Sequence, residues 1–156
     1  MQRNRRQKSG TRGITRLYAV QTLYEIQMSA TENWNRILEE AASSAEVTIT
    51  EDIVLTDVDK DFFRELIKTV LNNVDEIDKM ISKYLSADWS LERLDKVLLA
   101  VLRLGTCELR FFRDIPPLAV FNEYIEIAKA FAQKNDVSFV NGVLNSISEE
   151  TNKNME

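Results

Sequence analysis

At 156 residues, with 44% hydrophobic residues and a net charge of -5, the chain can form one domain, or two fused subdomains, with a buried core. It has no histidine, one cysteine (Cys107) and four glycines, a composition that argues against an enzyme, a metal site and a glycine-rich phosphate loop. No apolar run approaches the ~20 residues of a membrane span, and the lone cysteine fits a reducing cytoplasm.

Positive charge is concentrated at the N-terminus. The first acid is Glu25, and six basic residues precede it, so the rest of the chain carries about -11. These residues are Arg3, Arg5, Arg6, Lys8, Arg12 and Arg16. Such a separation predicts contact with a polyanion at one end of the protein, the alternative being a solvated tail without a specific role. The polar residues 1–11 are predicted to form a flexible basic arm.

From residue 12 to 150, apolar residues recur at helical spacing, which predicts a single all-α domain of about seven helices. The expected helices cover 11–29, 32–45, 56–71, 74–85, 90–112, 118–133 and 136–150, with caps at Thr56 and Asp136. A lone strand near 47–50 would have no partner, so 46–57 is expected to be a loop. Residues 151–156 are expected to form a frayed tail.

Two glycines and two aromatic residues carry packing predictions. Gly105 and Gly142 fall inside helical patterns, where each costs ~1 kcal/mol relative to alanine. Close approach of another helix would explain that cost, and chance is the alternative. Trp89 is predicted to be buried, and so is Phe131.

Four segments keep a common order along the chain. They are TRLYAVQTLY at 15–24, DWSLERL at 88–94 with AVLRLG at 100–105, VFNEYIEIAK at 120–129 and FVNGVL at 139–144. Together they resemble the NusB transcription antitermination family over residues 12–148. The resemblance implies seven helices in two packed subdomains and a role in processive transcription of ribosomal RNA operons. It also implies three partners, namely single-stranded boxA RNA, the ribosomal protein NusE and the transcribing RNA polymerase complex, with neither cofactor nor catalysis.

Single-stranded RNA needs cations for its phosphates and flat faces for its bases. Arg12 and Arg16, one turn apart on a predicted helix, are the strongest candidates, and by resemblance Arg16 matches an RNA-contacting position. Phe139 matches a position near a base, although it is also a candidate core residue. Weaker candidates are Arg3, Arg5, Arg6, Lys8, Lys129, Gln133, Asn135 and Asn141. A solvated face would equally explain Lys129 and Gln133, and helix capping would explain the asparagines.

Three residues are candidates for partner contact. By resemblance, Tyr24 matches a NusE-contacting position, with core packing as the alternative. Relatives carry an acid where this chain has Leu98, so the contact would use Asp95 or an apolar patch around Leu98. The alternative function is a protein-only helical adaptor, or a homodimer built on that patch, whose basic arm binds an acidic partner. The sequence leaves the oligomeric state and the RNA bases undetermined.

Overall fold

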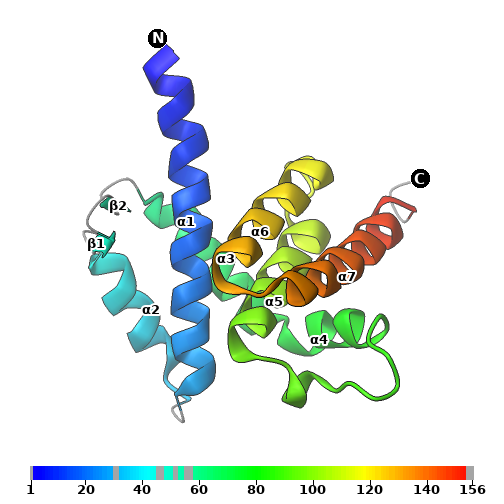
Figure 1. Ribbon diagram of the computed structural model, residues 1–156. Helices are drawn as coiled ribbons and strands as arrows, with labels where there is room; N and C mark the ends of the chain where they lie inside the picture. The colour runs from blue at the N-terminus through cyan, green and yellow to red at the C-terminus, as the bar shows by residue number, and fades with distance from the viewer. Residues whose placement is uncertain (1, 30–31, 45–47, 51–52, 55–57, 154–156) are drawn as a thin grey trace. The chain divides into compact units, whose positions relative to one another are not determined.

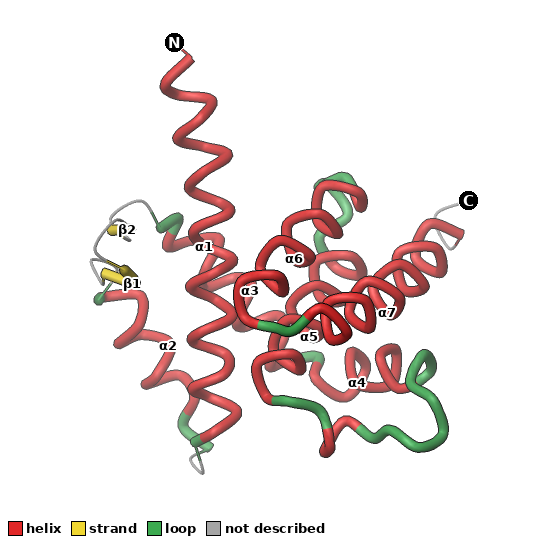
Figure 2. Tube along the Cα trace, viewed as in Figure 1, coloured by secondary structure: helices red, strands yellow, loops and turns green. Residues whose placement is uncertain are grey.

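The computed structural model describes residues 2–29, 32–44, 48–50, 53–54 and 58–153, with only the backbone described for 2–11, 48–50 and 53–54. These residues form seven α-helices, one 3₁₀-helix and two short strands, so the all-α prediction is confirmed (Figures 1 and 2). The chain divides into two compact units, Met1–Ile67 and Lys68–Glu156.

The N-terminal unit is built around one long helix. Its elements are α1 (Gln2–Met28), α2 (Trp34–Ser43), β1 (Thr48–Thr50), β2 (Ile53–Val54) and the first part of α3 (Lys60–Asn72). The Tyr18 ring stacks on Phe63 with centroids 5.1 Å apart, and the Tyr18 hydroxyl donates to the Ala41 carbonyl at 2.7 Å. One tyrosine therefore joins α1 to both α2 and α3 within this unit.

Three details of this unit differ from the predictions. Helix α1 begins at Gln2, so the backbone of 2–11 continues the helix. The expected loop at 46–57 is wrong in part, because β1 finds an antiparallel partner in β2. Helix α3 is capped by Asp59, whose Oδ1 accepts from the Phe62 amide at 3.0 Å. The predicted cap, Thr56, lies outside the described residues.

The C-terminal unit surrounds one apolar helix. It contains the end of α3, α4 (Val74–Ser82), the 3₁₀-helix η2 (Leu91–Arg93), α5 (Lys96–Phe111), α6 (Pro117–Phe131) and α7 (Lys134–Lys153). Helix α5 lies among α4, α6 and α7 (Figure 1), and eleven of its sixteen residues are buried. The prediction that this is the central helix is confirmed.

Helix boundaries in this unit follow local capping. Asp95 accepts from the amides of Val97 and Leu98 at 2.8 and 3.3 Å, so α5 begins six residues later than expected. Helix α7 begins before Asp136, which therefore lies in its first turn. It continues to Lys153, where a frayed tail was expected, because Thr151 is buried and its hydroxyl donates to the Ile147 carbonyl at 3.1 Å.

The two helical glycines have different surroundings. A Cβ at Gly105 would lie 3.0 and 3.2 Å from the two Leu144 methyls, so close packing explains that glycine. A Cβ at Gly142 would meet nothing within 4 Å, so packing does not explain it. The predicted burial of Trp89 and Phe131 is wrong, because their exposed fractions are 52% and 45%.

Candidate nucleic-acid interface

Two arginines of α1 lie over one aromatic ring. The guanidinium carbon of Arg12 is 4.6 Å from the Phe62 ring centroid, and that of Arg16 is 5.5 Å from it. Phe62 is buried in the first turn of α3, where the Asp59 cap fixes the backbone. The Asp59 amide in turn donates to the Thr15 hydroxyl at 2.9 Å, which ties this turn to α1. The ring is therefore a fixed support for both cations.

Burial separates the roles of the two arginines. Arg12 is exposed, whereas only 4% of Arg16 is exposed. A cation–π interaction with the Phe62 ring can stabilise each guanidinium by about 0.5–1 kcal/mol. Only the Arg12 guanidinium is exposed to a ligand. Both arginines were the strongest candidates from the sequence, and Arg12 is the more exposed of the two.

The N-terminal basic residues lie on the same helix as Arg12. The helical backbone of α1 starts at Gln2 and includes the positions of Arg3, Arg5, Arg6 and Lys8. Positions 5, 8, 12 and 16 follow one another at spacings of three or four, so they share one face of the helix. The predicted positive end is thus an extension of α1.

The remaining RNA candidates lie on α6, α7 and the residues between them. Lys129, Gln133, Asn135 and Asn141 are exposed, and Phe139 is half-buried. Lys129 pairs with Glu126 at 2.9 Å, and both side chains are more than half exposed, as expected of a solvated face. Asn135 and Asn141 lie inside α7, so neither is its cap. All five residues belong to the C-terminal unit.

Sequence reasoning missed an aromatic pair in this unit. The Trp89 and Phe139 rings lie 6.2 Å apart between centroids, tilted by 34°. Residues Ala87, Asp88, Trp89, Ser90 and Arg93 line a cleft of about 380 Å³. Hydrophobicity alone favoured burial of Trp89, whereas its place in a polar turn between two helices was the available signal of exposure.

The three candidates for partner contact differ in how far their side chains are exposed to solvent. Tyr24 is 38% exposed, so the core alternative does not account for it. Leu98 is 6% exposed and belongs to the core, so it offers no apolar patch. Asp95 is exposed and caps α5, which already gives it a structural role.

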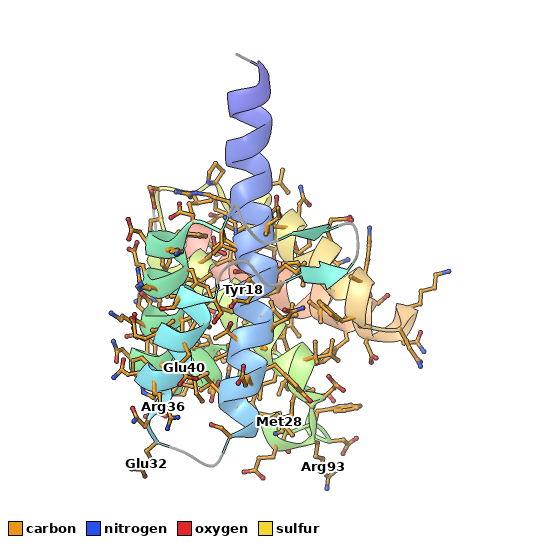
Figure 3. The ribbon with its side chains drawn as sticks, turned by 90° about the vertical axis from the view of Figure 1, so that its left-hand side faces the viewer. Tyr18, Met28, Glu32, Arg36, Glu40 and Arg93 are labelled. Carbon is orange, nitrogen blue, oxygen red and sulfur yellow. The ribbon has the colours of Figure 1, made fainter. Side chains whose placement is uncertain are left out.

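A polar cleft of about 350 Å³ lies between α1 and α2 of the N-terminal unit. Tyr18, Gln21, Thr22, Glu25, Ile37, Glu40, Ala41 and Ser44 line it. Figure 3 shows Tyr18 near the middle of α1, with Arg36 and Glu40 on the neighbouring helix. Burial and, secondarily, the Glu25 charge raise the pKa of Tyr18, so its hydroxyl stays protonated as a donor to Ala41.

Other site classes find no support in the described part of the chain. Within it, no three or more acidic, cysteine or histidine residues are grouped so as to hold a metal ion. Nor does any of its helices combine the length and apolar character needed to cross a membrane.

Comparisons with known proteins agree over most of the chain. The NusB family model matches residues 14–149. A transcription antitermination protein NusB from Sphingopyxis alaskensis is 39% identical over 94% of this chain and 97% of its own length. One from Caulobacter vibrioides is 38% identical over 87% and 91%. The solved T. maritima NusB has a TM-score of 0.73 at 37% identity, covering 89% of this chain and 91% of its own. A structure described as NusB and NusE in complex with dsRNA has a TM-score of 0.73 at 28% identity, covering 90% and 97%.

Proposed function

We propose that this chain, which belongs to the NusB family, holds boxA-type single-stranded RNA through the basic end of α1. It is an RNA-binding transcription antitermination factor rather than an enzyme, and it pairs with NusE. It acts on the transcript of ribosomal RNA operons, beside the transcribing RNA polymerase, and we place it in the cytoplasm.

One observation carries the RNA proposal. The exposed Arg12 guanidinium lies 4.6 Å from the Phe62 ring centroid, and the first 24 residues of the chain hold six cations and no acid. The ring limits the positions of that guanidinium, so less conformational entropy is lost when it binds a phosphate. The acidic remainder of the chain repels RNA, so the strongest phosphate contacts are expected at this end.

The other candidate RNA-binding residues differ in what supports them. The exposed side chains of Lys129, Gln133, Asn135 and Asn141, with the half-buried Phe139, can add polar and stacking contacts. Arg3, Arg5, Arg6 and Lys8 extend the basic helix toward further phosphates. Arg16 lies over the same ring but is buried, so it adds positive charge near Arg12 without being open to a ligand itself.

Tyr24 is the partner residue that we favour. Its 38% exposure leaves part of the ring and hydroxyl for a second protein, and tyrosine suits interfaces because it offers both area and a polar tip. Burial of Leu98 removes the support for a homodimer built on that residue. The solved relative with NusE and RNA supports the pairing.

The test is the binding of boxA-type RNA and of a scrambled RNA of equal length, with and without NusE. The proposal predicts preference for boxA and tighter binding with NusE. Tyr24→Ala should weaken NusE binding more than RNA binding, whereas Phe131→Ala, at another exposed aromatic, should change neither. Binding of NusE without any RNA binding would favour the protein-only adaptor.

A further inference from the structure

Trp89 is held in an exposed position by its own turn. Half of its surface is open to solvent, which is unusual for the largest apolar side chain. The Trp89 amide donates to the Ser86 carbonyl at 2.9 Å, and the Arg93 guanidinium reaches the Asp88 carbonyl at 3.5 Å. These contacts fix the backbone that carries the ring, so the exposure follows from an ordered turn.

The ring also has a partner on another element. The Phe139 ring on α7 lies 6.2 Å from it at a tilt of 34°, within the range of favourable aromatic pairs. Phe139 is itself half-buried, so the pair presents a partly exposed aromatic surface shared by the turn and α7.

The cleft beside Trp89 is open and has a mainly polar lining. Its volume of about 380 Å³ falls in the ~300–1,000 Å³ range of ligand pockets. Apart from the indole it is lined by Ala87, Asp88, Ser90 and Arg93, which supply an acceptor, a hydroxyl and a cation. Figure 3 shows Arg93 pointing away from the ribbon, where it can meet solvent or a ligand.

We infer that Trp89 and Phe139 form a stacking platform for nucleobases of the RNA, with Arg93 contacting the adjoining backbone. Nucleobases have flat faces and polar edges, and this matches an indole beside hydroxyl, carboxylate and guanidinium groups. An apolar helix of another protein would leave those polar groups without water or partners. Asp88 repels phosphate, so the backbone is expected to run on the Arg93 side. The inference rests on the proposed function and adds Trp89 and Arg93 to its site.

Fluorescence gives a direct test, because the chain has only two tryptophans. In a Trp34→Phe background, emission comes from Trp89 alone. Titration with boxA-type RNA should quench that emission and shield the indole from acrylamide, in parallel with the anisotropy of a labelled RNA. If anisotropy reports binding while Trp89 emission and acrylamide access stay unchanged, the inference is overturned and the proposed function stands.

Affinity gives a second, independent readout. Trp89→Ala should weaken RNA binding about tenfold, within the range measured for loss of one base–aromatic stack. Trp89→Phe should recover much of that loss, and Leu118→Ala, which truncates another exposed apolar side chain, should have no effect. The salt dependence should be unchanged in Trp89→Ala, because stacking releases no counterions. Wild-type affinity in Trp89→Ala would overturn the platform, and absence of RNA binding by the wild type would overturn the proposed function as well.

Discussion

The two helical glycines allow a matched test of how α5 packs. In an open helix position, Gly→Ala stabilises by ~1 kcal/mol because alanine loses less backbone entropy. The methyl group added by Gly142→Ala would have no atom within 4 Å. This substitution should therefore raise the unfolding temperature by about 2–4 °C for a chain of this size. Gly105→Ala gains the same propensity but pushes a methyl against Leu144 and Tyr124, at 3.0 and 3.5 Å.

Leu144 cannot easily move aside, because it is fully buried. Overpacking of this kind costs about 1–3 kcal/mol, which outweighs the helical gain. We therefore expect Gly105→Ala to lower the unfolding temperature. In a Leu144→Ala background the obstructing methyls are gone, and the same substitution should become stabilising.

Thermal unfolding of the four members of this double-mutant cycle, followed by circular dichroism, measures the coupling. Gly142→Ala serves as the control for helix propensity. If Gly105→Ala stabilises the wild type as much as Gly142→Ala does, the close contact with Leu144 does not exist as described.

Three further predictions concern other contacts. Tyr124→Phe removes a hydrogen bond to the buried Glu108 carboxylate and should lower the free energy of unfolding by about 1.5–3 kcal/mol in urea, whereas an unchanged midpoint would contradict a stabilising role. The hydrogen bond from Lys83 lowers the pKa of Glu150 below its usual 4.5. Its stabilisation is therefore present above that value and is lost as pH falls through the folded-state pKa. Glu150→Gln should lower the unfolding temperature at neutral pH but not in strong acid, and an equal effect at both would refute the linkage. Phe62→Leu should weaken RNA binding about two- to fivefold by removing the ring beneath the arginines, and unaltered affinity in a folded variant would show that the ring does not matter.

Local sequence patterns predicted the α-helices but not all of their boundaries. Apolar residues at helical spacing placed all seven, and Asn72-Asn73 correctly marked the break between α3 and α4. The start of α5 was missed, because Ser90 and Asp95 are both good caps and only Asp95 is used. Pairing of β1 with β2 was missed because neither strand has enough length to give a signal.

The positive charge of the candidate site could be predicted from the sequence. Which of its side chains are exposed to solvent could not. Arg12 and Arg16 share one face of α1 and both lie over Phe62, some fifty residues along the chain, but no periodicity can tell which of the two is buried. The exposure of Trp89 likewise depends on a turn and on Phe139, a contact between distant segments. Leu98 was a candidate partner contact, and only the fold reveals that it is buried.

The salt dependence of RNA binding by an Arg12 variant tests the account most directly. Arg12→Gln removes one cation from the basic face, and Arg36→Gln removes one of equal charge from α2, where the Arg36 side chain is 76% exposed. If Arg12 holds a phosphate, its loss should reduce the slope of log affinity against log salt by about 0.7, as expected for one single-strand contact. Arg36→Gln should leave the slope unchanged. Equal slopes for wild type and Arg12→Gln would contradict the claim that RNA is held at the basic end of α1.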